Sequence, residues 1–243
     1  MRPEISAFPS LHFYGGKIAN GENVFQQSYT SSVVQQNRLR AYTFMQVRGT
    51  ENRHPSGSFQ NVAEAHAVVN FLCRMKHDAL RLGITRNWAS VEKLRVITFY
   101  QAQVGLLKTL LAKRGLKEVV VTTVDSSQGC EAEIVVISFV RGSSDHVGFL
   151  ADDRRLNVAL TRAQYQLILV GDAVGMTKLK NSLTMKALVA DAQQRCCIYS
   201  DETQKRKSQY KQGHKRQQRG KGLNPRKKQK LESTGIKRKP GTR

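Results

Sequence analysis

The chain has 243 residues, a formal net charge of +22 and 40% hydrophobic residues, which is enough for a packed core. It has no stretch near the ~18 consecutive apolar residues of a membrane span and no apolar signal-peptide region at its start, which excludes a membrane protein. The four cysteines lack the CxxC pairs and histidine companions of a zinc site. We therefore expect reduced thiols and no metal site in a soluble, intracellular protein.

The positive charge is concentrated towards the C-terminus. Residues 204–243 contain 16 lysines and arginines against one acid, Glu232, so this tail carries +15 of the +22. Because it has few apolar side chains to offset the entropy of ordering, we expect a disordered tail after a globular domain at residues 1–203. Its basic clusters, such as PRKKQK at residues 225–230, indicate nuclear import or non-specific phosphate contact, with the nucleus favoured over the cytoplasm. A solvated tail without a partner is the alternative.

The hydrophobic pattern predicts the elements of an α/β fold. Residues 1–27 are broken by prolines and glycines and predict turns. Strands are expected where apolar residues alternate or run continuously, at residues 42–48, 93–100, 118–125, 134–139 and 167–170. Helices are expected where apolar residues recur every three or four positions, at residues 61–76, 101–114, 154–163 and 176–191. The continuous β-branched runs are typical of strands covered on both faces, so we expect a mostly parallel sheet between helices. Arg141 and His146 are predicted to be exposed in a loop of this fold.

Two polar segments lie at strand ends, where open α/β sheets place their ligands. The first, DSSQGCE at residues 125–131, sets an amide and a carboxylate around Gly129, which allows close backbone approach. The second, RRLNVALTRA at residues 154–163, puts Arg155 and Arg162 two helical turns apart, so both should project from one helix face. Taken singly, the segments could equally be a turn with a helix cap and a solvated helix face.

Together, the two segments and the strands beside them resemble a known family. VDSSQGCEAEIVVIS, followed by GFL and RRLNVALTRA, is similar to motifs V and VI of the Upf1-like superfamily 1 helicases over residues 122–172. The resemblance implies a three-layer RecA-like domain of the P-loop NTPase type, the second such domain of a nucleic-acid-dependent ATPase. The ending at residues 187–198 is similar to that of senataxin-type members.

This resemblance implies a nucleotide-binding set. Arg162 corresponds to the arginine that reaches the γ-phosphate of ATP across a cleft, a role that suits a planar, permanently charged guanidinium. Glu131 resembles the acidic residue that contacts the nucleotide from this side, and Gln128 lies beside it. Gly129 and Arg155 complete the expected set.

A second set is expected to bind nucleic acid. TFYQAQ is similar to the family's ITPYxxQ element, with Phe99 in place of the usual proline. Thr98, Tyr100 and Gln103 would bind phosphate and stack on a base of single-stranded RNA or DNA. A buried tyrosine and a helix cap are the alternative. Thr123 resembles the motif V threonine that hydrogen-bonds a strand phosphate.

The remaining parts of an ATPase are expected outside this sequence. A GxxxxGK[ST] phosphate loop is absent, and Gly16-Lys17 is the nearest approach to one. The opening MRPEIS resembles the segment after the tyrosine-arginine pair of motif IV, so that pair would precede Met1, as would a first RecA-like domain that shares ATP and Mg²⁺ with this one. We therefore expect a C-terminal motor domain of an ATP-dependent helicase that is inactive alone. The alternative is a non-catalytic nucleic-acid-binding or adaptor protein that keeps the helicase fold.

Overall fold

The computed structural model describes residues 1–36, 39–84, 87–142, 148–180 and 182–200. The expected tail at residues 204–243 and His146 lie outside these ranges. Met1–Ser200 forms one compact unit. Within the described part of the chain, no helix is long and apolar enough to cross a membrane.

Six parallel strands form the central sheet, which confirms the expected α/β fold. Their spatial order is β5 (Val120–Thr123), β4 (Leu94–Thr98), β6 (Ala132–Ser138), β7 (Ala163–Gly171), β1 (Tyr42–Gln46) and β8 (Ile198–Tyr199). A separate antiparallel hairpin joins β2 (Asn52–Arg53) to β3 (Phe59–Gln60). Because the six strands are parallel, their carboxyl ends share one edge of the sheet and their amino ends share the other.

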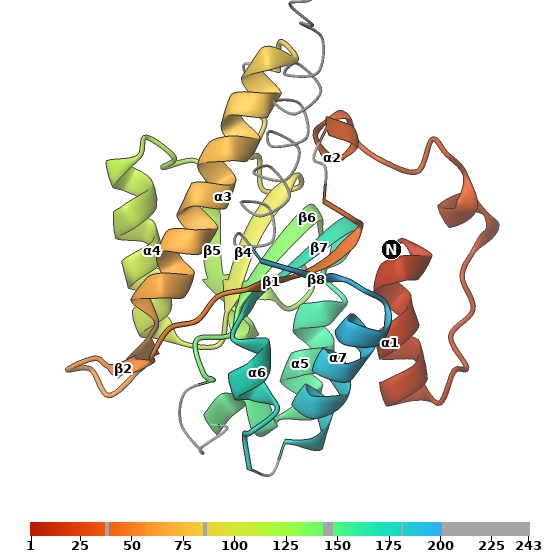
Figure 1. The fold of residues 1–243 in the computed structure, drawn as a ribbon. Helices are drawn as coiled ribbons and strands as arrows, with labels where there is room; N and C mark the ends of the chain where they lie inside the picture. The colour runs from red at the N-terminus through yellow and green to blue at the C-terminus, as the bar shows by residue number, and fades with distance from the viewer. Residues whose placement is uncertain (37–38, 85–86, 143–147, 181, 201–243) are drawn as a thin grey trace, which may run out of the picture. The chain divides into compact units, whose positions relative to one another are not determined.

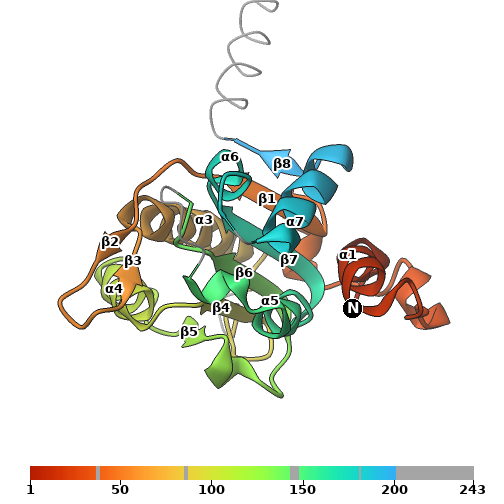
Figure 2. The ribbon, with the colours of Figure 1, turned by 90° about the horizontal axis from the view of Figure 1, so that it is seen from below.

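Helices cover both faces of this sheet, as Figures 1 and 2 show. One face packs against α2 (Ser32–Gln36), α3 (Val62–Arg81) and α4 (Gln101–Lys113). The other packs against α1 (Pro3–Tyr14), α5 (Asp153–Leu160), α6 (Ala173–Met176) and α7 (Leu183–Gln194). Successive residues of β6 alternate between the two cores, with Val135 and Ile137 on one side and Ile134 and Val136 on the other. The three-layer RecA-like architecture is thus confirmed.

The helix α1 corrects the expectation of turns near the N-terminus. Pro3 occupies the first helical turn, where its missing N–H has no helical partner to lose. Pro9 lies inside the helix and costs it one hydrogen bond. Ile5 and Phe8 are buried against the sheet, and this tertiary packing outweighs the local cost. Gly15, at φ +58°, ends the helix in a left-handed conformation.

Two helical predictions later in the chain also differ from the structure. The helix expected at residues 154–163 is α5, which stops at Leu160 with Thr161 as its C-cap, and β7 begins at Ala163. Arg162 therefore lies in the short link between helix and strand. The helix expected at residues 176–191 is instead divided into α6 and α7. Short 3₁₀ helices form at η1 (Glu22–Phe25), η2 (Asp125–Ser127) and η3 (Gly148–Ala151).

Candidate functional site

The predicted site residues lie at opposite edges of the sheet. Thr98 and Thr123 end the neighbouring strands β4 and β5 at the carboxyl edge. Glu131 and Arg162 immediately precede β6 and β7, so they lie at the amino edge. Open sheets usually bind ligands at their carboxyl ends. The expectation that both polar segments follow this rule is wrong for Glu131 and Arg162.

At the amino edge, backbone and side-chain contacts bring three distant segments together. The Ala132 N–H donates to the Arg162 carbonyl at 3.0 Å. The Gln164 side-chain amide donates to Glu131 Oε2 at 3.3 Å, and the Arg2 N–H donates to the Gln164 carbonyl at 2.8 Å. The N-terminus thus joins the two motif-like segments. We call Arg2, Glu131, Arg162 and Gln164 the amino-edge cluster.

The Arg162 guanidinium contacts only uncharged acceptors among the described residues. Its Nε donates to the Val158 carbonyl at 2.9 Å, its Nη1 to the Cys130 carbonyl at 3.4 Å, and its Nη2 to Thr161 Oγ1 at 3.2 Å. The side chain is half-buried, and none of the ion pairs in the described part of the chain involves it. A guanidinium has five N–H donors. In the described part of the chain, Arg162 therefore has N–H donors to spare and a positive charge that no carboxylate pairs with.

The turn that carries Glu131 depends on glycine. Gln128, Gly129 and Glu131 are exposed, and Gly129 has φ +77°, a conformation that side chains of L residues rarely adopt. The turn returns the chain from the carboxyl end of β5 to the amino end of β6. The Glu131 carboxylate is therefore exposed at the amino edge of the sheet, and the backbone of the turn is accessible at Gln128 and Gly129.

Arg155 does not share a helix face with Arg162, contrary to the prediction. Arg155 binds Asp125 through one edge of its guanidinium, with Nε donating to Oδ1 at 2.8 Å and Nη2 donating to Oδ2. This contact raises the pKa of Arg155. Asp125 follows β5 at the carboxyl edge, so Arg155 belongs to that side of the sheet. The guanidinium also lies 4.7 Å from the centre of the Phe149 ring.

At the carboxyl edge, three of the four predicted nucleic-acid contacts are buried. The exposed fractions of Thr98, Tyr100 and Gln103 are 0%, 2% and 0%. The Tyr100 ring lies between those of Phe59, at 5.9 Å, and Phe149, at 5.5 Å, and burial raises its pKa. The buried-tyrosine alternative therefore describes this structure, and the Tyr100 ring has no open face on which to stack a base.

Thr123 is the partly exposed member of the set. Its hydroxyl lies 3.1 Å from that of Ser126 and accepts from the Ser126 N–H at 3.3 Å. Two hydroxyls and a backbone N–H thus gather just beyond the end of β5. Such groups are the usual partners of phosphate oxygens.

Gln103 belongs to a buried network that sequence reasoning missed. Its Nε2 donates to the hydroxyl of Ser138 at 3.0 Å, and that hydroxyl donates to Glu64 Oε2 at 2.7 Å. The same carboxylate oxygen accepts from the Val140 N–H at 2.9 Å. Burial, reinforced by Glu51, raises the pKa of Glu64 to about 8 despite these hydrogen bonds. One signal of this network was present in the sequence: Glu64 is an acidic residue within the apolar stripe of α3, four residues before Val68.

The loop after β6 also departs from expectation. Arg141 was predicted to be exposed, but only 4% of it is accessible. Its Nη1 lies 3.8 Å from Glu51 Oε1, and its guanidinium lies 4.3 Å from the centre of the Phe59 ring. The charge is therefore buried between a carboxylate and an aromatic face. Arg141 serves the packing of this edge rather than a solvent-facing contact.

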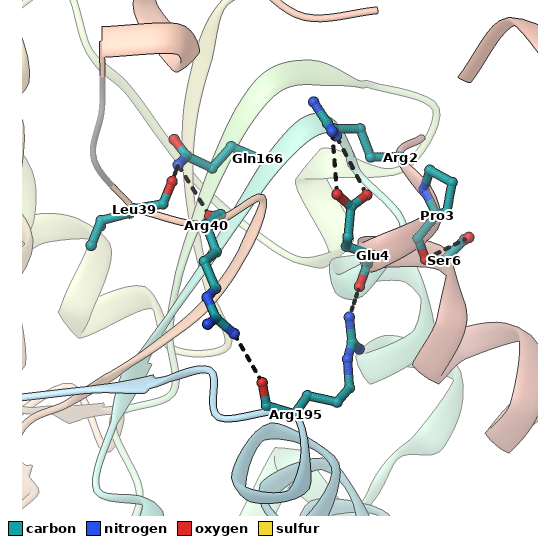
Figure 3. Close-up of polar contacts among 8 residues, drawn as sticks. All are labelled: Arg2, Pro3, Glu4, Ser6, Leu39, Arg40, Gln166 and Arg195. Atoms are coloured by element: carbon teal, nitrogen blue, oxygen red, sulfur yellow. Dashed lines mark hydrogen bonds and ion pairs between the residues drawn. The ribbon is translucent and has the colours of Figure 1, made fainter. Parts of the chain in front are cut away.

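A cavity of about 690 Å³ opens at the amino end of β1, lined by residues that include Arg2, Arg40 and Arg195. As Figure 3 shows, Arg2 pairs with Glu4, and Arg40 donates to the Arg195 carbonyl. Arg195 in turn donates to the Glu4 carbonyl and pairs with Asp191. These contacts tie the start of α1 to the end of α7. Neither Arg162 nor Glu131 lines the cavity.

No group of three or more histidine, cysteine, aspartate or glutamate side chains in the described ranges could bind a metal ion. The amino-edge cluster nevertheless fits a phosphate-bearing ligand, because Arg162 combines open donors with an unneutralised charge. The fold is that of a RecA-like α/β domain.

Comparison with known proteins identifies the family. The family model described as "AAA domain" matches residues 1–174. The chain belongs to this family, and it is a helicase domain of the Upf1-like group.

Three relatives illustrate the similarity. Helicase sen1 of Schizosaccharomyces pombe is 34% identical over 206 residues, which are 82% of this chain and 12% of that protein. The regulator of nonsense transcripts 1 homolog of Drosophila melanogaster is 34% identical over 186 residues, 73% of this chain and 15% of that protein. Probable helicase MAGATAMA 3 of Arabidopsis thaliana is 31% identical over 203 residues, 80% of this chain and 24% of that protein. The chain thus spans between about an eighth and a quarter of these relatives.

Proposed function

We propose that this chain is the C-terminal motor domain of an ATP-dependent RNA or DNA helicase. Its amino-edge cluster completes an ATP site held mainly by a first RecA-like domain, and its carboxyl edge grips part of a single strand. ATP supplies the phosphoryl group whose transfer to water drives the motor, and Mg²⁺ accompanies it. Residues 1–203 form the motor domain, and residues 204–243 form a basic tail that favours a nuclear location.

The observation that carries this proposal is the state of Arg162. It lies next to Glu131 at the amino edge, with only uncharged acceptors around its guanidinium in the described part of the chain. A cation in this condition can bind phosphate without first breaking an ion pair. Arg162 leaves the carbonyls of Val158 and Cys130 and stabilises the charge on the transferring phosphoryl group.

The neighbouring residues have supporting roles. Glu131 accepts hydrogen bonds from the nucleotide, while Gln128 and the exposed backbone at Gly129 line its approach. Arg155, which is bound to Asp125, belongs to the strand side instead of binding the nucleotide itself. This division follows from the opposite edges that Arg155 and Arg162 occupy.

On the strand side, Thr123 and Ser126 bind a phosphate of single-stranded RNA or DNA through two hydroxyls and an N–H. Thr98, Tyr100 and Gln103 act from beneath the surface by fixing the ends of β4 and α4. Such contacts bind the backbone and are indifferent to base sequence.

The test is ATP hydrolysis by the purified chain with single-stranded RNA, alone and mixed with a first domain from a related helicase. Turnover is expected only in the mixture. Arg162→Ala should lower its kcat by about 10³-fold or more, as for other arginine fingers. Arg154→Ala, at an exposed position near the start of α5, should leave the rate unchanged. Robust turnover by the chain alone, or a mixture indifferent to Arg162→Ala, would refute the proposal.

The second candidate is a non-catalytic nucleic-acid-binding or adaptor protein with the helicase fold, which needs only the exposed groups of Thr123 and Ser126 at the carboxyl edge. In that case every mixture remains inactive while single-strand binding persists. The same assay thus separates the two functions.

A further inference from the structure

Phe149 is an aromatic side chain exposed beside the proposed strand grip. It lies in η3, between β6 and α5, and 52% of it is accessible. The neighbouring Leu150 is completely buried, so the 3₁₀ turn anchors one side chain in the core and leaves the other outside. An exposed aromatic ring offers a flat face to a ligand, and the contacts around Phe149 decide whether that face is held ready for one.

Two fixed groups orient the Phe149 ring. The Arg155 guanidinium lies over it at 4.7 Å and is itself oriented by two hydrogen bonds to Asp125. The buried Tyr100 ring also packs against it, with centroids 5.5 Å apart and planes at 45°. The ring is therefore oriented before any ligand arrives, which lowers the entropy cost of stacking on it.

The turn before Phe149 is built to bring it close to Tyr100. Gly148 has φ +56°, and a Cβ at this position would lie 2.7 Å from Tyr100 Oη. Only glycine permits both the conformation and the approach. Gly148 thus permits the close packing of η3 on Tyr100.

Phe149 is also continuous with the phosphate-binding groups. Asp125, which fixes Arg155, lies between Thr123 and Ser126 in sequence, and these two residues hydrogen-bond to each other. Hydroxyls, a guanidinium and an exposed ring therefore follow one another along the carboxyl edge. Phosphate-binding groups beside an aromatic platform can bind single strands without sequence choice.

We propose that Phe149 is the base-stacking residue of the strand grip, with a nucleobase on its open side while Thr123 and Ser126 hold the adjoining phosphate. The role expected for Tyr100 passes to Phe149, and Tyr100 is its support. This inference rests on the proposed single-strand binding and adds the residue that contacts the base.

The alternative is that Phe149 merely covers Tyr100. Substitutions that separate burial from aromaticity distinguish the two roles. Phe149→Leu keeps an apolar cover but has no flat π-face, whereas Phe149→Trp keeps both. Leu183→Ala is a matched control, because Leu183 is an exposed apolar residue at the start of α7, a helix that carries none of the proposed strand-grip residues.

The experiment measures the binding of the full chain to a fluorescent single-stranded oligouridylate and to the same strand carrying abasic sites, by anisotropy at raised salt. Raised salt weakens the contribution of the basic tail, which binds by counterion release. Phe149→Ala and Phe149→Leu should raise Kd for the intact strand by about 5- to 150-fold, while Phe149→Trp and Leu183→Ala leave it near the wild-type value. The abasic strand should bind wild type and Phe149→Leu equally.

A second readout is fluorescence. Trp88 is the only native tryptophan and is buried, so the emission of Phe149→Trp that changes on strand binding comes from the new ring. Wild-type affinity in Phe149→Leu, with weaker binding by Thr123→Ala, would overturn the stacking role and leave the grip intact. Failure of the wild-type chain to bind the intact strand at all would overturn both.

Discussion

The Oε2 atom of Glu64 accepts a hydrogen bond from the Val140 N–H at 2.9 Å, although Val140 has φ +72°. A β-branched residue in this left-handed region is strained, and the strain persists only where the surroundings compensate. Glu64 supplies that compensation from α3. Through this contact, a buried carboxyl fixes the point at which the chain leaves β6 towards the proposed strand grip.

Glu64 should make stability depend on pH. Its pKa is about 8 in the folded chain, against 4.5 for a solvated glutamate side chain, because burial disfavours the charged form. Between these values the folded state holds a proton that unfolding releases, so the free energy of unfolding should fall by about 1.4 kcal/mol per pH unit as pH rises. Below about pH 4.5 and above about pH 8 this contribution is constant.

Glu64→Gln removes the titration while keeping the shape, so the stability of the variant relative to wild type should improve steadily with rising pH. Urea unfolding at intervals from about pH 5 to 8 measures this difference. Glu118→Gln is the control, because the pKa of Glu118 is lowered and its titration lies below that window. A difference between Glu64→Gln and wild type that is constant across the window would contradict the prediction.

Gly148→Ala should destabilise the chain by about 1–3 kcal/mol, since it combines an unfavourable φ with a contact to Tyr100 Oη. Gly105 provides the opposite case. It lies within α4 with no atom within 4 Å of a Cβ, so Gly105→Ala should stabilise the chain by about 0.5–1 kcal/mol. The midpoints of thermal unfolding measure both effects. Equal changes in the two midpoints would show that neither the φ angle of Gly148 nor its approach to Tyr100 affects stability.

The pair of Asp125 and Arg155 should contribute little to stability, because Asp125 is largely exposed. We expect a coupling below about 1 kcal/mol in a double-mutant cycle of Asp125→Asn and Arg155→Lys, weakening further with salt. Lysine keeps the charge of Arg155 but lacks its planar guanidinium and its stacking on Phe149. Arg155→Lys should therefore lose most of the interaction energy with Asp125. Full retention in Arg155→Lys would mean that charge alone joins the two segments.

Phe8 should be the main anchor of α1. Its ring is 95% buried within the core cluster that includes Leu188, so Phe8→Ala should cost about 3–5 kcal/mol. Leu11→Ala on the same helix removes a side chain that is 72% exposed and should change stability by less than about 0.5 kcal/mol. The two midpoints of urea unfolding give the comparison. Similar values would indicate that α1 is not fixed by its buried face.

Local sequence was sufficient for most strands and for α3 and α4. The runs at β6 and β7 are apolar on both faces, a pattern that is typical of parallel strands covered by helices on both sides. Asn61 caps α3 through the Glu64 N–H, and Gly115 follows α4 with φ +66°, signals that are readable in the sequence. The motif residues were likewise recognisable from their order alone.

Local sequence was insufficient for α1 and for the end of α5. Pro9 hides a helix that exists because Ile5 and Phe8 are buried against distant strands. In the ALTRA segment, helical periodicity continues past Leu160, yet residues 163–171 pair with β6 and β1, and strand pairing outweighs the local preference. Arg162 therefore does not lie on the helix face on which it was predicted, but in the link between α5 and β7.

The sequence by itself determined the class of fold, the family and the residues that carry charge, because hydrophobic period and motif order are properties of the chain read in one dimension. Only the tertiary structure decided that Arg162 and Glu131 meet at the amino edge, that Tyr100 is buried beneath Phe149, and that Glu64 supports Val140. The physical reason is that edges, burial and network partners arise from strand order and packing between segments far apart in sequence, and no local pattern encodes these.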